Sequence, residues 1–106
     1  MKQYLTPEQT AKLIELGLEK PRLLYFGNNT IGNYAYTISE LIEMLPTDNN
    51  IGWNIRKHNN ITDISKTQYS VIVDVNMFLS AYTAESEELI DALYGMIIKL
   101  KKERVI

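Results

Sequence analysis

The stretch Tyr69-Ser70-Val71-Ile72-Val73-Asp74-Val75-Asn76 decides the fold of this chain. An aromatic residue and three valines occupy its odd-numbered positions, and a more polar set occupies the even-numbered ones. Alternation with a period of two residues is typical of a β-strand that is buried on one face. We therefore predict a strand over 69–76 with its valines in the core and Asp74 on the opposite face.

A second strand is predicted over 51–57, where Ile51-Gly52-Trp53-Asn54-Ile55-Arg56-Lys57 alternates in the same way. The polar segment 58–68 separates the two strands, so they are expected to form an antiparallel hairpin with a long loop. A shorter hairpin is predicted from 23–26 and 34–37, which flank a stretch rich in glycine and asparagine. The sheet should thus contain three or four strands.

Three amphipathic helices are predicted from three similar short sequence segments. These segments are Leu13-Ile14-Glu15-Leu16, Leu41-Ile42-Glu43-Met44-Leu45 and Leu89-Ile90-Asp91-Ala92-Leu93. Each segment places apolar residues at neighbouring helical positions and an acidic residue on the opposite side of the helix. The fold expected from these elements is α+β: a small antiparallel sheet covered on one face by helices 7–17, 38–45 and 84–102.

The helix ends are also visible in the sequence. Thr-x-x-Gln over 6–9 and Thr-x-x-Glu over 37–40 are capping boxes, and Thr83 is expected to open the last helix. Gly17 is expected to end the first helix in the left-handed conformation, and Pro46 to end the second.

The bulk composition limits the class of protein. A chain of 106 residues is one domain by length, residues 1–106. The absence of cysteine excludes disulfides, thiolate metal ligands and cysteine nucleophiles. A net charge of −2 argues against a nucleic-acid partner, and no apolar run approaches the roughly 18–20 residues that span a membrane. The N-terminus lacks the apolar segment of a signal peptide, so we expect a cytoplasmic protein.

Motifs for catalysis or metal binding are weak or absent in the sequence. Gly27-x-x-x-x-Gly32 has the glycine spacing of a Walker A loop, but Asn33-Tyr34 stands where Lys-Ser/Thr is required. His58 is the only histidine, and no other ligand types surround it in a metal-binding pattern. We therefore expect no cofactor, no metal and no enzyme activity, and name no catalytic residue. A hydrolase working through His58 and an acid stays open as a third interpretation.

The aromatic residues give the only indication of a binding site. The chain holds seven tyrosines against two phenylalanines and one tryptophan, and tyrosine is suited to surfaces that are half apolar and half wet. The candidate binding residues are Tyr25, Tyr34, Tyr36, Trp53, Arg56, Lys57 and His58. We expect a non-enzymatic protein-interaction module that binds a protein partner or a second copy of the chain. The alternative is binding of a small ligand or single-stranded nucleic acid at the aromatic and basic strand end. Another interpretation is that these aromatic residues belong to an ordinary hydrophobic core and that only the tyrosine hydroxyls reach the solvent.

Three segments also resemble a group of proteins. They are Tyr4-Leu5-Thr6-Pro7-Glu8-Gln9, the run 36–46 and the run 86–94. These segments are similar to those of small hypothetical proteins encoded in the genomes and prophages of anaerobic gut bacteria. The resemblance implies a bacterial cytoplasm and a phage or mobile-element origin, and it implies no activity.

Overall fold

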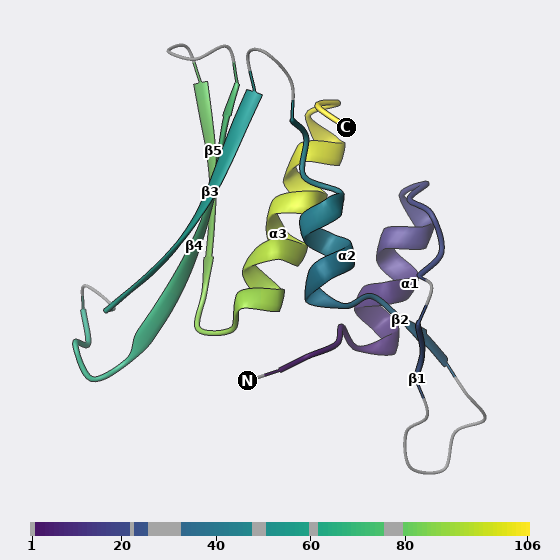
Figure 1. Cartoon of the computed structure of the whole chain (residues 1–106), viewed down its shortest axis with the longest axis horizontal. Helices are drawn as coiled ribbons and strands as arrows, with labels where there is room; N and C mark the ends of the chain where they lie inside the picture. Colours follow the sequence, from purple (N-terminus) through teal and green to yellow (C-terminus); the bar gives the residue numbers. More distant parts are fainter. Residues whose placement is uncertain (1, 22, 26–32, 48–50, 60–61, 76–79) are drawn as a thin grey trace.

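The computed structural model describes residues 2–21, 23–25, 33–47, 51–59, 62–75 and 80–106. In chain order the elements are α1 (Pro7–Glu15), β1 (Leu23–Tyr25), β2 (Asn33–Ala35), α2 (Ile38–Glu43), β3 (Ile51–Asn59), β4 (Thr67–Val75), β5 (Ser80–Ser86) and α3 (Leu89–Lys102). Strands β3, β4 and β5 form one antiparallel sheet, and all three helices lie on the same side of it (Figure 1). The expected α+β class, with an antiparallel sheet and three helices, is confirmed.

Strand β4 is the centre of the sheet, as its sequence predicted. It pairs with β3 from Ile51 opposite Val75 to Asn59 opposite Thr67, and with β5 on its other side. Val71 and Val73 are fully buried beneath the helices, whereas Asp74 faces the other way and is half-buried. Strand β3 extends two residues beyond the predicted end at 57, so His58 lies in a strand and not in a loop.

The predicted starts of α1 and α2 are confirmed, whereas both helices end two residues earlier than predicted, at Glu15 and Glu43. The Thr6 hydroxyl accepts a hydrogen bond from the Gln9 amide (3.1 Å), and the Gln9 side chain accepts one from the Thr6 amide (3.0 Å). Thr37 and Glu40 form the same reciprocal capping box at the start of α2. Gly17 has φ +95°, a conformation that an L-residue with a Cβ rarely adopts, and it follows the last turn of α1.

The predicted start of the last helix is wrong. Residues 80–86 form β5, Thr83 lies inside that strand, and α3 begins at Leu89 and not at 84. Along β5 the half-buried residues Tyr82, Ala84 and Ser86 alternate with exposed ones, which is the period of a strand. Only Tyr82 and Ala84 are apolar members of this alternation, and the neighbouring threonine and acids resemble a helix start, so the strand pattern is weak in the sequence.

Helix α3 supplies more buried side chains to the core than any other described element. It packs on β4 and β5, and its fully buried side chains are Ile90, Leu93, Met96, Ile97 and Leu100. Helix α2 packs against α3, and α1 packs against β2. Strands β1 and β2 form a separate two-stranded antiparallel hairpin at the far end of the helical layer (Figure 1), so the main sheet has three strands.

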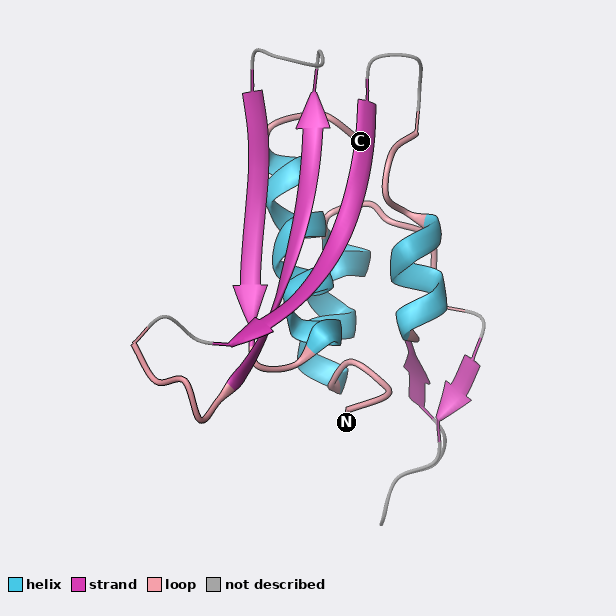
Figure 2. Ribbon diagram, turned by 60° about the vertical axis from the view of Figure 1, so that its left-hand side comes forward, coloured by secondary structure: helices cyan, strands magenta, loops and turns pink. Residues whose placement is uncertain are grey.

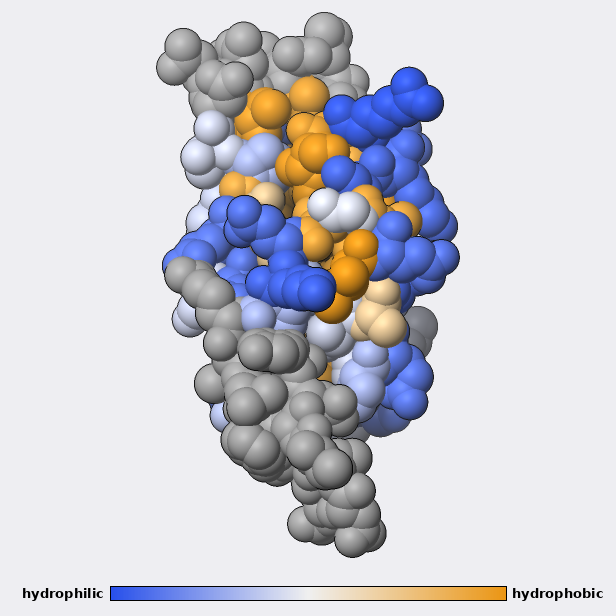
Figure 3. Space-filling view, turned by 90° about the vertical axis from the view of Figure 1, so that its right-hand side faces the viewer, coloured by the Kyte–Doolittle hydropathy of each residue, from blue (hydrophilic) through white to orange (hydrophobic). Residues whose placement is uncertain are grey.

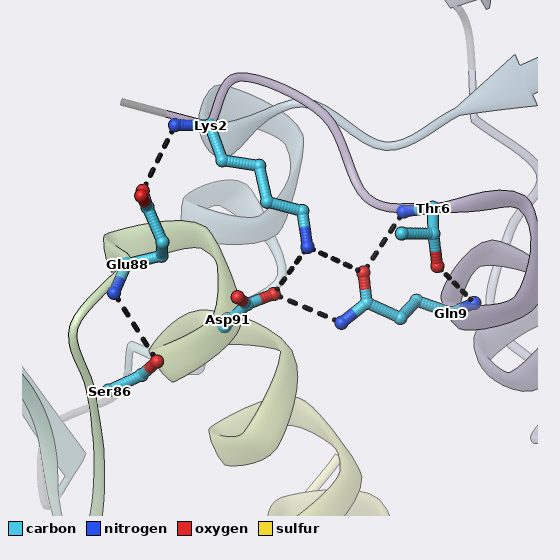
Figure 4. Close-up of polar contacts among 6 residues, drawn as sticks. All are labelled: Lys2, Thr6, Gln9, Ser86, Glu88 and Asp91. Atoms are coloured by element: carbon cyan, nitrogen blue, oxygen red, sulfur yellow. Dashed lines mark hydrogen bonds and ion pairs between the residues drawn. The ribbon is translucent and has the colours of Figure 1, made fainter.

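A polar cluster joins the N-terminus to the start of α3 (Figure 4). The Asp91 carboxylate accepts hydrogen bonds from Lys2 Nζ at 2.9 Å and Gln9 Nε2 at 3.0 Å. Glu88 accepts a hydrogen bond from the Lys2 amide at 3.0 Å. Burial opposes ionisation of Asp91, but the hydrogen bonds from Gln9 and Lys2 and the lysine charge outweigh it and lower the pKa of this carboxyl.

No helix in the described ranges is both long enough and apolar enough to span a membrane.

Candidate interaction surface

One face of the three-stranded sheet carries no helix (Figure 2). We call it the outer face. It consists of alternate residues of the three strands, which the strand register brings side by side: Asn54, Arg56, His58, Ser70, Ile72, Asp74, Ala81, Thr83 and Glu85. Most of these side chains are small or polar, which is typical of an antiparallel sheet with one face in water.

A shallow hollow of about 290 Å³ lies on the outer face. It is lined by Arg56 and His58 from β3, Ser70 and Ile72 from β4, and Thr83 and Glu85 from β5. The Arg56 guanidinium has no hydrogen bond or ion pair with the rest of the described chain. The Glu85 carboxylate accepts a hydrogen bond from Gln68 Nε2 at 3.0 Å. The hollow therefore combines an unpaired cation, hydroxyl groups and an acid that already has a partner.

The closest polar contact in the hollow joins His58 to Ser70. His58 Nε2 lies 2.6 Å from Ser70 Oγ, and His58 Nδ1 lies 3.0 Å from the carbonyl oxygen of Asn59. If Nδ1 carries the proton and donates to that carbonyl, Nε2 accepts from the serine hydroxyl, as in base–nucleophile pairs. Only 4% of Ser70 is exposed, so a substrate has little access to its hydroxyl in this conformation. The bond therefore links β3 to β4, and we derive no catalytic step from it.

The β5 edge of the sheet is covered by α3. Lys99 Nζ, from α3, donates a hydrogen bond to the Thr83 carbonyl oxygen at 2.6 Å. A Cβ built at Gly95 would lie 3.8 Å from the Ala84 Cβ, so α3 approaches β5 closely. Covering an edge strand with a helix is one of the ways in which proteins prevent further strands from pairing. The β5 edge is thus a protected edge.

Within the described residues, no side chain from a helix is hydrogen-bonded to the backbone of β3, although the strand itself carries Arg56 and Lys57. Strand β3 is nine residues long and contains no proline, and among the strands that the structure describes it pairs with β4 alone. Outside the regular elements, no backbone–backbone hydrogen bond between described residues involves β3. In an antiparallel pair every second residue directs its N–H and C=O away from the partner. We call β3 the open edge, because these outward groups have no strand beside them.

The structure does not bring the seven predicted binding residues into one site. Trp53 and Lys57 lie on the face of β3 that carries the helices, with Lys57 Nζ 5.8 Å from the centre of the Tyr69 ring, whereas Arg56 and His58 lie on the outer face. A stacking platform that combines Trp53 with Arg56 is therefore not formed. The side chains of Tyr25 and Tyr34 lie outside the described part of the structure.

Tyr36 is part of the core. Its ring is fully buried, and its hydroxyl donates a hydrogen bond to the Glu19 carbonyl oxygen. Burial, followed by the negative charges of Glu40 and Glu19, raises the pKa of the Tyr36 hydroxyl. For this residue, the interpretation as an ordinary core tyrosine describes the structure.

Sequence reasoning missed several residues of this surface. Ser70 was placed on the polar face of its strand but was not among the candidate binding residues, and Thr83 was expected to open a helix. The sequence indicates Lys99 only as one of the basic residues at the end of a helix. Ser70 could have been found, because the predicted hairpin places 70 opposite a residue near 56. The contact between Lys99 and Thr83 could not, since it requires β5, which was read as helix.

A second hollow of about 260 Å³ lies near the start of α2. It is lined by Glu19, Lys20, Glu40, Glu43 and Met44. Within the described residues no group of three or more histidine or acidic side chains is arranged to hold a metal ion. The expectation that the chain binds no metal or cofactor stays a prediction.

An apolar band lies on the side of the molecule that carries α1 (Figure 3). The partly buried apolar side chains of α1, of the turn after it and of the C-terminus pack against the core: Ile14, Leu16, Leu18, Val105 and Ile106. In the described part of the chain, the only large apolar side chains that are clearly exposed are Tyr4 and Ile64. The band is therefore the rim of the core.

Comparison of this chain with family models, with curated proteins and with solved structures found no match.

Proposed function

We propose that this chain is a protein-interaction module that accepts a β-strand along β3. The observation that carries the proposal is the difference between the two edges of one sheet. A helix and the Lys99 ammonium cover β5, whereas no described strand pairs with the outer side of β3. The proposal assigns no catalytic role, in keeping with the low exposure of Ser70.

The chemistry of the open edge supports strand addition. Main-chain hydrogen bonds to the outward N–H and C=O groups supply affinity, and the alternating side chains supply specificity. On the helix side of β3, Ile51, Trp53 and Ile55 pack against the core but stay partly exposed. A strand added beside β3 would cover the rest of these side chains, which adds a hydrophobic contribution to the hydrogen bonds.

Nuclear magnetic resonance tests the proposal without knowledge of the partner. Isotope-labelled protein is compared alone at low concentration, alone at high concentration, and in unlabelled extract of the source cells. We expect the amide signals of β3 to shift and their hydrogen exchange to slow in the concentrated sample, in the cell extract or in both. The amide signals of β5 should stay unchanged. Trp53 is the only tryptophan, so its emission should move to shorter wavelength under the same conditions.

Two results would contradict strand addition at β3. One is a response at β5 or on the α1 side of the molecule with β3 unchanged. The other is amide hydrogen exchange of β3 that is the same in the concentrated sample and in the cell extract as in the dilute sample.

The hollow on the outer face favours a second function, binding of a small carboxylate or phosphate. The Arg56 guanidinium, which has no partner among the described residues, and the Thr83 hydroxyl are donors suited to an oxyanion. Arg56 and Lys57 are neighbours on opposite faces of β3, which provides a matched control. Titration with acetate and with inorganic phosphate should shift the His58 signals, and Arg56→Gln should abolish the shift whereas Lys57→Gln should keep it. Equal loss in both variants would indicate nonspecific attraction to positive charge.

A further inference from the structure

We infer that the strand accepted by β3 is β3 of a second copy of this chain, antiparallel, with Ile55 opposite Ile55 of the second copy. This inference rests on the proposed function, because it names the partner of the same edge. It follows from the length of β3, from its two faces and from the positions of its charges.

The length of β3 favours this register. The strand runs from Ile51 to Asn59, so its middle residue is Ile55. An antiparallel pair centred on Ile55 brings all nine residues of each copy into contact, with 51 opposite 59 and 53 opposite 57. A register centred on any other residue leaves part of each strand unpaired and forms fewer main-chain hydrogen bonds.

The two faces of β3 also agree with this register. Residues directly opposite each other in an antiparallel pair point to the same face of the sheet. Pairing odd-numbered residues with odd-numbered ones therefore keeps the helical layers of both copies on one side of a continuous sheet. The result is a six-stranded sheet with two-fold symmetry, in which the same edge of each copy is used.

On the side that faces the helices, the junction between the two copies of β3 is lined by apolar and aromatic residues. Ile55 meets Ile55 of the second copy, and Trp53 meets Lys57 of the second copy. Lys57 already lies on this face, 5.8 Å from the centre of the Tyr69 ring. An ammonium above a tryptophan face is a favourable cation–π contact, and the symmetry supplies it twice.

The charges disfavour the registers that are centred on the basic end of β3. In the register centred on Ile55, Arg56 lies opposite the uncharged Asn54 of the second copy, so no like charges stand directly opposite each other. A pair centred on Arg56 would place Arg56 opposite Arg56 of the second copy, and a pair centred on Lys57 would do the same for Lys57. Like charges directly opposite each other are destabilising. The basic end of β3 therefore selects the register as well as limiting nonspecific pairing.

The protected β5 edge limits growth beyond two copies. After two β3 strands have paired, the outer strands of the enlarged sheet are the two copies of β5. Each of these carries the hydrogen bond from Lys99 to the Thr83 carbonyl. The assembly should stop at a dimer and not continue into a filament.

Pairwise cysteine cross-linking tests the register. The chain has no cysteine, and Asn54 and Arg56 are exposed, so Asn54→Cys and Arg56→Cys can be made without disturbing the core. Opposite residues have Cβ atoms about 4.5–5.5 Å apart, close to the range of a disulfide, whereas diagonal neighbours lie about 7–8 Å apart. A mixture of the two variants under mild oxidation should form the mixed disulfide several-fold faster than either variant forms a disulfide with itself. Ala81→Cys, exposed on β5, should cross-link with none of them.

Sedimentation equilibrium of the unmodified chain provides the second measurement and should give a dimer. Equal rates for all cysteine pairs, including Ala81→Cys, would show random collision and overturn the inference. Absence of both dimer and cross-link, with β3 signals that still respond in cell extract, would overturn the second copy as partner and leave strand addition standing. Absence of all three responses would overturn the proposed function itself.

Discussion

The two edges of the main sheet share one neighbour, β4, and differ in almost everything else. Strand β3 is the longer and carries two adjacent basic residues, Arg56 and Lys57, yet no described strand pairs with its outer side. Strand β5 places Tyr82 and Ala84 on its helix-facing side, and α3 lies close against it with Lys99 bound to a carbonyl. The protection of an edge here comes from the helix that packs on it, and the strand's own charges set which partners fit.

The largest expected effect is on the free energy of unfolding, and it compares a side chain of α3, which packs on β5, with a side chain of β3. Leu93 of α3 is fully buried, so Leu93→Ala should lower the free energy of unfolding by about 2–5 kcal/mol. Ile55 of β3 is partly exposed, so Ile55→Ala should cost clearly less. Urea unfolding of both variants checks this, and equal losses would show that β3 is as much a part of the core as α3.

The second expected effect concerns the start of α3. The lowered pKa of Asp91 means that this carboxylate stabilises the fold above its ordinary pKa of 3.8, and that the contribution is lost as the pH falls through the lower value of the folded state. Because the ion pair with Lys2 is about 30% exposed, Asp91→Asn should cost about 1 kcal/mol at pH 7 and almost nothing in strong acid. Urea midpoints at pH 7 and pH 2 measure the difference, and a loss that does not change with pH would contradict it.

A stabilising change is expected at the contact between α3 and β5. A Cβ at Gly95 would meet Ala84 at an ordinary contact distance of 3.8 Å, so Gly95→Ala should raise the free energy of unfolding by about 0.5–1 kcal/mol. Gly17→Ala is the matched control, because φ +95° strains any residue with a Cβ and the change should destabilise. Thermal unfolding of the two variants should therefore move in opposite directions; a fall for Gly95→Ala would mean that α3 is already too close to β5.

The smallest effect on stability and the clearest effect on assembly are expected at Lys99. Lys99→Met removes the hydrogen bond to the Thr83 carbonyl and leaves β5 a second unprotected edge. Light scattering should then show species larger than the dimer that grow with concentration, with little change in the unfolding curve. Unchanged size distribution would show that packing of α3, and not the lysine, protects β5.

The sequence predicted the elements whose signals are local. The valine alternation of β4, the capping boxes at Thr6 and Thr37 and the left-handed Gly17 all lie within a few neighbouring residues. Strand β5 was missed because its half-buried side holds only two apolar residues, Tyr82 and Ala84, and the strand is held in place by contacts with β4 and α3. Propensity is a weak guide where tertiary contacts decide the state of a segment.

The candidate surface was harder to predict than the fold. Which strand forms an edge depends on the pairing of β4 with segments on both sides, and the missed β5 removed that information. The aromatic residues were grouped by composition, but alternation along β3 sends Trp53 and Arg56 to opposite faces. Tyr36 looked suited to a wet surface, and its hydroxyl instead binds a carbonyl oxygen below the surface.

Matched lysine substitutions on the two edges, followed by sedimentation equilibrium, compare β3 and β5 most directly. Asn54 on β3 and Ala81 on β5 are both exposed on the outer face. Asn54→Lys sets a positive charge opposite Arg56 of the second copy twice, and should weaken dimerisation roughly 2- to 30-fold, whereas Asn54→Asp should strengthen it. Ala81→Lys should leave the dimerisation constant unchanged. Weakening by Ala81→Lys with no response to either Asn54 variant would contradict strand addition at β3.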